Sequence, residues 1–151
     1  MAGAGQFGKA DEGIFAYWLH CWKENRPLKY LGFGGQGFQV RDCLHPRDLV
    51  AVLQKQIATP NDNRPAIVNF SGGAASATSL AQLSEWCTNR WGQRAVVSDP
   101  TPRTFDLPWV VLDHTLASQV WDWTPQTTSH RILTEIADFA DTQQDWIGYS
   151  A

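Results

Sequence analysis

The chain has 151 residues, of which 43% are hydrophobic and 18% charged, and a formal net charge of −3; this balance is typical of one globular domain spanning residues 1–151 and excludes a disordered tail. No apolar run approaches the roughly 18 to 20 residues that span a bilayer, and no signal peptide is evident, so we expect a cytoplasmic protein without a membrane partner. Lys and Arg number 12 against 15 Asp and Glu and form no run, so no nucleic-acid partner is expected.

The first half of the chain predicts two helices around a pair of short strands. Apolar residues recur at three- and four-residue spacing over residues 11–24, which predicts a helix that ends at an Asn-Arg-Pro sequence. Residues 28–33 and 38–43 are strand candidates, so we expect a hairpin or two strands flanking a glycine loop. A second helix is predicted with Pro46 at its first position, ending near residue 59.

The second half predicts strands that alternate with helices. The compact apolar run at residues 66–70 indicates a buried strand. Ser79 and Gln82 form a capping box, which predicts a helix from there to Gly92. Further elements are predicted as strands at residues 94–98 and 109–113, an extended loop at 99–103, and helices at 115–120 and 129–141. We therefore expect a small α/β domain with a mixed sheet of about five short strands and about five helices.

Cysteine and tryptophan usage gives two further expectations. The three cysteines, Cys21, Cys43 and Cys87, are odd in number and widely spaced, so buried free thiols are favoured over disulfides or a zinc site. Eight tryptophans are many for a domain of this length. Such rings supply a large buried area and also mark binding surfaces, and we favour packing in the core and in interfaces over a platform for sugar stacking.

Two glycine-rich stretches, at residues 3–8 and 32–37, spell Gly-x-Gly-x-x-Gly. A dinucleotide site needs a strand before this motif and a helix after it, because backbone N–H groups and the helix N-terminus meet the pyrophosphate. Neither stretch is predicted to have both, so we expect no NAD site. The chain also lacks Gly-x-Ser-x-Gly, His-Glu-x-x-His, Tyr-x-x-x-Lys and histidines at metal-ligand spacing, so neither catalytic residues nor a metal are expected.

Residues 41–49, Arg-Asp-Cys-Leu-His-Pro-Arg-Asp-Leu, resemble a segment in the carboxyl-terminal, substrate-binding half of extended short-chain dehydrogenase/reductase enzymes that act on nucleotide sugars. The order is kept along the chain, with an Asn-x-x-Gly-Gly turn at 69–73, a helix opening at 79–83, Arg-x-x-Asp at 103–106, and a closing element at 113–125 in which Asp122 replaces the usual glycine. Within this epimerase and dehydratase family, residues 32–42 are most similar to the CDP-paratose 2-epimerase (CDP-tyvelose epimerase) group.

The resemblance implies two phosphate-binding arginines. Arg41 and Arg103 match positions expected to grip the diphosphate, and a guanidinium fork suits two phosphate oxygens. Another interpretation stays open for each arginine. Arg41 would pair with Asp42 or Asp48, and Arg103 with Asp106.

The same resemblance implies four further substrate-binding residues. Gln39 offers a directional hydrogen bond to sugar or phosphate, and Tyr30 or Phe33 faces the base. Residues 5–8 are similar to the end of the family's Gly-Pro-x-Gln loop, which adds Gln6. Family members are longer, and the half that carries the NAD fingerprint and the Tyr-x-x-x-Lys pair has no counterpart in this sequence.

Taken together, these features predict a stand-alone or truncated nucleotide-sugar-binding lobe that is not an enzyme on its own. Its ligand is a CDP- or UDP-sugar, and NAD enters only with a complementary dinucleotide-binding chain. One alternative is an interaction module that has lost ligand binding and persists through its oligomer interface. Another is one half of a split epimerase. For all three of these functions we expect an exposed tryptophan-rich apolar face, covered by a homo-oligomer or by an NAD-binding partner chain.

Overall fold

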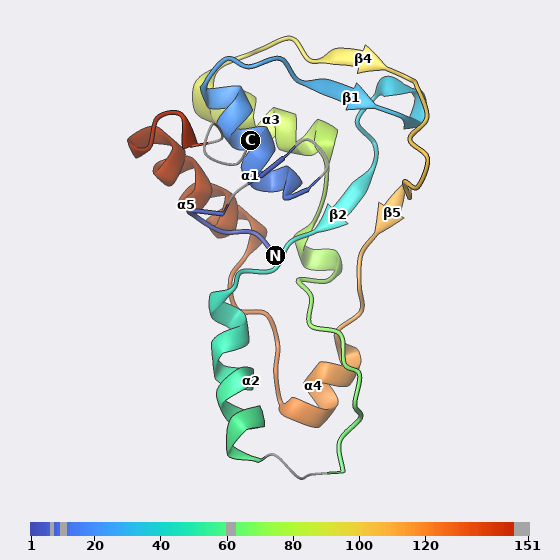
Figure 1. Cartoon of the computed structure of the whole chain (residues 1–151), viewed down its shortest axis with the longest axis vertical. Coiled ribbons are helices and arrows are strands. Elements are labelled where there is room, and N and C mark those ends of the chain that lie inside the picture. The colour runs from blue at the N-terminus through green and yellow to red at the C-terminus, as the bar shows by residue number, and fades with distance from the viewer. Residues whose placement is uncertain (7, 10–11, 60–62, 147–151) are drawn as a thin grey trace.

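A computed structural model describes residues 1–6, 8–9, 12–59 and 63–146. In Figure 1 the elements form two parts, one above the other. The upper part, here called the main body, contains α1, α3, α5 and all the strands. The lower part, called the extension, contains α2, α4 and residues 63–73. The first residues of the chain lie between the two parts, where the Ala2 amide donates to the Leu44 carbonyl.

The predicted helices are present, with shifts of one to three residues at their ends. Helix α2 begins one residue after Pro46, and the other helices agree with their periodic apolar patterns. None of the helices in the described part of the chain is both long enough and apolar enough to cross a membrane. The five helices of the described residues are α1 (Ile14–Lys23), α2 (Arg47–Ala58), α3 (Leu80–Trp91), α4 (Thr115–Trp121) and α5 (Ser129–Thr142).

The start of α3 confirms the predicted capping box. The Ser79 hydroxyl oxygen accepts from the Gln82 amide at 3.2 Å, and the Gln82 side-chain oxygen accepts from the Ser79 amide at 2.9 Å. The helix ends at Gly92, whose φ of 96° favours glycine. Both ends of this helix are therefore set by local sequence.

Within the described residues five short strands form two small sheets, which confirms a mixed α/β fold. In one sheet β1 (Lys29–Leu31) pairs in parallel with β4 (Val97–Asp99). In the other, β2 (Val40–Asp42) lies between β3 (Ala77–Ser79), which is antiparallel to it, and β5 (Trp109–Val110), which is parallel. Because β1 and β2 belong to different sheets, the hairpin alternative is wrong. The two strands flank a glycine-rich 3-10 turn at Phe33–Gly35.

The predicted buried strand at residues 66–70 is wrong. These residues belong to no sheet, and the Ile67 side chain is 85% exposed. Only Val68 and Phe70 are half-buried, against the extension. A run of β-branched and aromatic residues indicates a strand only where another strand is available to pair with it, and the described chain offers none here.

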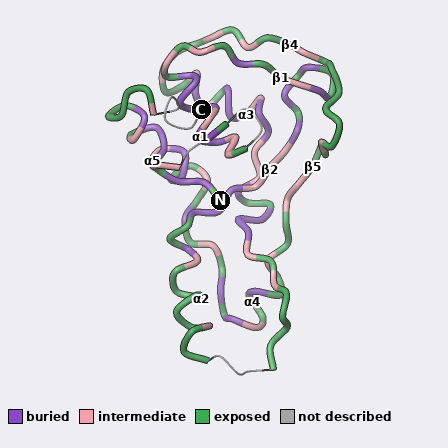
Figure 2. The backbone as a smooth tube through the Cα atoms, in the orientation of Figure 1, coloured by how far each residue is buried: buried purple, intermediate pink, exposed green. Residues whose placement is uncertain are grey.

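Two separate hydrophobic clusters hold the molecule together (Figure 2). The cluster of the main body joins α1, α3 and α5 and includes Trp18, Leu83 and Ile132, each at most 2% exposed. The cluster of the extension is smaller and lies between α2 and α4. Its buried members are Leu44, Val52, Ala117, Trp121 and Trp123.

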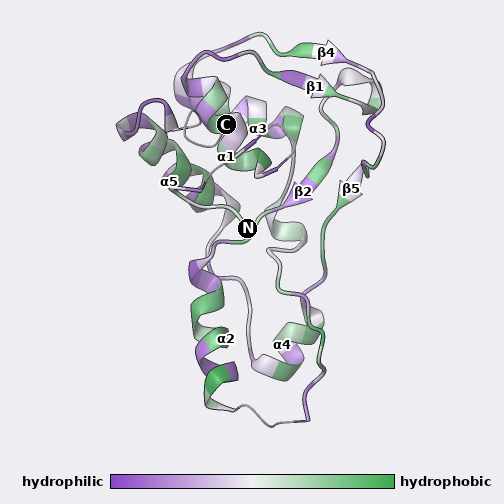
Figure 3. Cartoon of the chain, in the orientation of Figure 1, coloured by the Kyte–Doolittle hydropathy of each residue, from purple (hydrophilic) through white to green (hydrophobic). Residues whose placement is uncertain are grey.

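The tryptophans confirm the packing interpretation, but the expected tryptophan-rich exposed face is wrong. Trp18, Trp22, Trp121 and Trp123 are buried, whereas Trp109 is 60% exposed. The exposed apolar side chains are mostly aliphatic residues and phenylalanines, and Figure 3 shows hydrophobic segments on both α2 and α4 of the extension. The three cysteines are buried free thiols, as predicted.

Candidate functional site

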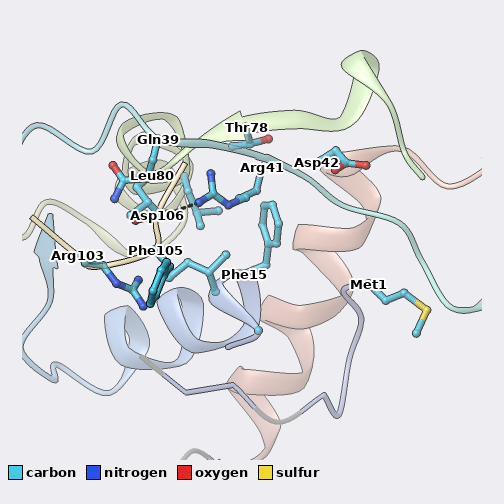
Figure 4. A pocket seen from close by; sticks show the side chains of 13 residues that line it. Met1, Phe15, Gln39, Arg41, Asp42, Thr78, Leu80, Arg103, Phe105 and Asp106 are labelled. Carbon is cyan, nitrogen blue, oxygen red and sulfur yellow. Dashed lines mark hydrogen bonds and ion pairs between the residues drawn. The ribbon is translucent and has the colours of Figure 1, made fainter. Parts of the chain in front are cut away.

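A cavity of about 430 Å³ opens beside the antiparallel pair β2–β3 in the main body (Figure 4). Its wall is built from the first turn of α1, the strands β2 and β3, the first turn of α3 and the loop at residues 103–106. This volume is within the range of small-molecule sites. The lining residues that carry polar groups or cover the opening are Gln39, Arg41, Asp42, Thr78, Arg103, Phe105 and Asp106.

Arg41 lies at the centre of β2 and is held by two contacts. Its Nη1 donates to the Val40 carbonyl at 2.7 Å, and its Nη2 lies 2.6 Å from Asp106 Oδ1. Neither alternative pairing forms. The Asp42 carboxylate accepts from the Gly72 amide, and the Asp48 carboxylate accepts from the Thr127 amide and hydroxyl.

Arg103 lines the same cavity from the loop opposite β2, next to Phe105 in Figure 4. The expected alternative pairing of Arg103 with Asp106 does not form, because Asp106 is bonded to Arg41 and to the Leu107 amide. Within the described residues Arg103 has no ion-pair partner, and its side chain is exposed. The cavity therefore presents one paired and one unpaired guanidinium group.

Gln39 lines this cavity and is itself almost fully buried. The residue is 8% exposed, and its Nε2 donates to the Leu31 carbonyl at 3.2 Å. Its Oε1 is buried without a hydrogen-bond partner within the described chain. A second cavity, of about 290 Å³, is also lined by Gln39 and Arg103, so the two side chains lie where the cavities meet.

The other three predicted site residues lie outside both cavities. Tyr30 stacks on Trp18, with ring centroids 5.6 Å apart, and its hydroxyl donates to Ser84 Oγ at 2.7 Å. Phe33 belongs to the glycine-rich turn and is 38% exposed. Gln6 lies near the end of α5, where its carbonyl accepts from Trp146 Nε1 at 3.2 Å. The structure therefore brings together Gln39, Arg41 and Arg103, and not these three.

Among the lining residues that the sequence did not single out are Phe105 and Thr78. Phe105 is 98% exposed although it lines the cavity, so its ring stands at the rim. The Arg-x-x-Asp motif contains this residue but gives no reason to single it out. Thr78 was missed because β3, the strand that carries it, was not predicted.

The glycine-rich stretches do not have the geometry of a dinucleotide site. The stretch at residues 32–37 leads through a 3-10 turn into β2, so no helix N-terminus follows it. In the stretch at residues 3–8, Phe7 lies outside the described residues. Among the residues that the structure describes, no group of three His, Cys, Asp or Glu side chains could hold a metal ion.

Several solved structures have a fold similar to that of this chain. UDP-glucose 4-epimerase of Thermotoga maritima, solved with UDP-glucose, is 20% identical over 93% of this chain and 43% of its own, with a TM-score of 0.71. MoeE5, solved with UDP-glucuronic acid and NAD, is 23% identical over 93% of this chain and 44% of its own, with a TM-score of 0.73. UDP-glucose 4-epimerase of Thermus thermophilus, solved with NAD, is 18% identical over 92% of this chain and 43% of its own, with a TM-score of 0.72.

The chain has the fold of the C-terminal part of the two UDP-glucose 4-epimerases, and MoeE5 shares this fold. It spans less than half of the length of each of them. No protein-family model matches the chain, and no curated protein sequence matches it. At these sequence identities the likeness establishes the fold and not the ligand of this chain.

Proposed function

We propose that residues 1–151 form a nucleotide-sugar-binding domain, related to NAD-dependent sugar-nucleotide epimerases and without catalytic activity on its own. The observation that carries this proposal is that Arg41 and Arg103, which lie 62 positions apart in the sequence, line one cavity together with Gln39. Two guanidinium groups on one cavity suit the two phosphates of a diphosphate ester. Two solved structures with a similar fold, UDP-glucose 4-epimerase of Thermotoga maritima and MoeE5, contain UDP-sugars, which supports this ligand class.

A ligand that binds Arg41 meets a guanidinium group that is already ion-paired. In the ligand-free chain its Nη2 is bonded to Asp106, so a diphosphate has to share this guanidinium group with the carboxylate or displace it. Arg103 has no ion-pair partner within the described residues, so a phosphate that binds it displaces no carboxylate. Each charge-assisted hydrogen bond contributes about 1.5 to 3 kcal/mol. With one arginine already paired, we expect a weak complex, with a Kd of ~0.1 to 1 mM.

The base and the cofactor are assigned by different arguments. The resemblance of residues 32–42 to the CDP-paratose 2-epimerase group favours a CDP-sugar, whereas the solved structures name UDP-sugars. NAD is present in several of those structures. Because the glycine-rich stretches of this chain are unsuited to a pyrophosphate, we assign NAD to a complementary chain or chain portion. When bound there, NAD would oxidise a sugar hydroxyl and later return the hydride.

Titration calorimetry of the chain against CDP, UDP and a CDP-hexose tests the proposal. We expect saturable heat with at least one of these ligands and its loss in Arg41→Ala. Arg131→Ala is the matched control, because Arg131 is also an ion-paired arginine but lies on α5, away from the cavity. Circular dichroism establishes that each variant is folded. The absence of heat with all three ligands from folded protein rejects the proposal.

A second candidate function, a non-binding interaction module, is favoured by exposed apolar groups. Ile57, Ile67 and Phe105 are each at least 80% exposed, more than isolated surface hydrophobics require. Such a module would self-associate and give no heat with any nucleotide. Sedimentation analysis beside the titration separates the two functions, because only this module requires an oligomer.

A further inference from the structure

The Phe105 side chain takes almost no part in the packing of the fold. It is 98% exposed and belongs to neither hydrophobic cluster of the described residues. Folding therefore gains little from this ring, because the hydrophobic contribution is roughly proportional to the apolar area that is removed from water. A single exposed hydrophobic side chain needs no explanation by itself. What the ring can contact is decided by where it lies.

The position of Phe105 is fixed by hydrogen bonds of the residues that follow it. The Asp106 carboxylate accepts from Arg41 Nη2 at 2.6 Å. Two residues further on, the Pro108 carbonyl accepts from the Val40 amide at 2.8 Å. The loop that carries Phe105 is therefore attached to β2, the strand that forms a wall of the larger cavity, and the ring stands at the rim of that cavity.

The larger cavity combines a polar wall with this apolar rim. Hydrogen-bonding groups on the wall belong to Gln39, Arg41 and Thr78. Arg103 lies beside the Phe105 ring at the rim (Figure 4). Guanidinium, amide and hydroxyl groups suit phosphates and sugar hydroxyls. The phenylalanine ring has no donor or acceptor group, so it favours a flat apolar surface.

The base is the part of a nucleotide sugar that has such a surface. Bases stack on aromatic side chains through their π-faces, and this contact tolerates every base because each of them has a π-face. The base is joined to the diphosphate through the ribose alone. A diphosphate held by Arg103 therefore brings the base within reach of the ring that lies beside this arginine.

We propose that Phe105 stacks on the base of a nucleotide bound in the larger cavity and covers the open side of that base. The inference rests on the proposed function, because it takes the diphosphate to lie at Arg41 and Arg103. The contact strengthens the binding of CDP and of UDP by the same factor. Selection between cytosine and uracil therefore depends on groups other than this ring.

NMR titrations with CDP, UDP, a CDP-hexose and inorganic pyrophosphate test this contact and suit a weak complex. Phe105→Ala should weaken the binding of CDP and UDP by the same factor, at least about fivefold, because that is the lower range for stacking of one base. Pyrophosphate has no base and should bind equally to both proteins. The ring current of Phe105 should shift the ring protons of the bound base upfield in the wild type and not in Phe105→Ala.

Three further variants separate stacking from a general effect on the loop. Phe105→Tyr keeps an aromatic ring and should bind nucleotides like the wild type. Phe105→Leu is apolar but has no π-face, so it should bind them nearly as weakly as Phe105→Ala. Phe38→Ala is the matched control, because Phe38 is also exposed, by 62%, but lines neither cavity. Circular dichroism establishes that each variant is folded.

Three outcomes overturn the inference and leave the proposed function standing, provided that Arg41→Ala still loses nucleotide binding. The first is unchanged CDP and UDP affinity in Phe105→Ala. The second is an equal loss of pyrophosphate affinity, which would assign the ring to positioning Arg103. The third is a loss confined to the CDP-hexose, which would place the ring on the sugar. If folded protein binds none of the four ligands, the proposed function is rejected and this inference with it.

Discussion

At the scale of single residues, the contact between Arg41 and Asp106 determines what the cavity offers to an anion. Their side chains are 29% and 12% exposed and lie 2.6 Å apart. Asp106 also accepts from the Leu107 amide at 2.9 Å. The carboxylate therefore neutralises one of the two guanidinium groups that would meet a diphosphate.

Asp106→Asn should strengthen nucleotide binding. The amide oxygen can still accept from Leu107, but it no longer neutralises Arg41, so the guanidinium group becomes available to phosphate. We expect the affinity for CDP or UDP to rise by about threefold to tenfold, because tenfold corresponds to about 1.4 kcal/mol. Titration calorimetry measures it. Asp138→Asn, which removes the same charge from a surface pair with Arg90, should leave the affinity unchanged. Weaker binding in Asp106→Asn would show that the carboxylate contacts the ligand.

The buried thiols give a pH dependence that stability measurements can detect. Burial raises the pKa of Cys87 to about 12, and burial together with the Asp42 charge raises that of Cys43 to about 11. Thiols of the unfolded chain titrate near their ordinary pKa of about 8.5. Above that pH the unfolded state releases protons that the folded state keeps, so stability is retained below about pH 8.5 and falls as the pH rises toward 11.

We therefore expect Cys87→Ala to reduce the slope of stability against pH. Between pH 9 and 11 each such thiol contributes up to about 1.4 kcal/mol per pH unit. Urea unfolding at pH 7, 9 and 10 measures the slope in both proteins. The variant should be less stable at pH 7, because a buried side chain is shortened, yet lose less stability as the pH rises. Parallel pH profiles of the two proteins would contradict this explanation.

The sequence singles out two arginines that line one cavity, but it does not predict the partner of Arg41. Motifs in a fixed order along one chain pick out Arg41 and Arg103 without any knowledge of distance. The partner of Arg41 is 65 residues away, and the Ser84 partner of Tyr30 is 54 residues away. Such pairs depend on how strands and helices pack, which local patterns do not contain. For the same reason the stacking of Tyr30 in the core could not be predicted.

At the scale of elements, the sequence predicts an element correctly where the contacts that define its ends lie within the element itself. The capping box and the terminal glycine of α3 are satisfied within that helix, so the sequence predicts both ends. The apolar run at residues 66–70 carries an equally clear strand signal, but a strand needs a partner edge. Strand β3 was missed because three residues of ordinary β propensity become a strand only by pairing with β2.

Ser79→Ala should destabilise the chain by about 1 kcal/mol. The substitution removes the oxygen that accepts from the Gln82 amide and leaves an unsatisfied donor at the start of α3. Urea unfolding at neutral pH measures the difference in the free energy of unfolding. Ser98→Ala, on an exposed position of β4, is the matched control and should change stability by less than about 0.5 kcal/mol. Equal effects of the two substitutions would mean that the capping box contributes nothing.

At the scale of the whole molecule, the two clusters differ in size. Among the described residues, the cluster of the main body has 16 buried residues, most of them from α1, α3 and α5, whereas the cluster of the extension has five. The extension is also fixed by Asp48 near the start of α2, whose carboxylate accepts from the Gln126 and Thr127 amides at 3.1 and 3.0 Å. That contact joins the base of the extension to the chain leading into α5. The stability of the outer part of the extension therefore depends on its small cluster.

We expect the extension to open without unfolding of the main body. Fewer buried apolar groups mean a lower free energy of local opening, so amides of α2 and α4 should exchange with solvent at least about tenfold faster than those of α1 and α3. Val52→Ala should accelerate exchange in the extension alone, because Val52 contacts only that cluster. Ile132→Ala should lower the protection of the main body, because Ile132 belongs to the cluster that joins its three helices. Native-state hydrogen exchange with mass spectrometry resolves these helices. If Val52→Ala lowered protection equally in all of them, the molecule would unfold as one cooperative unit.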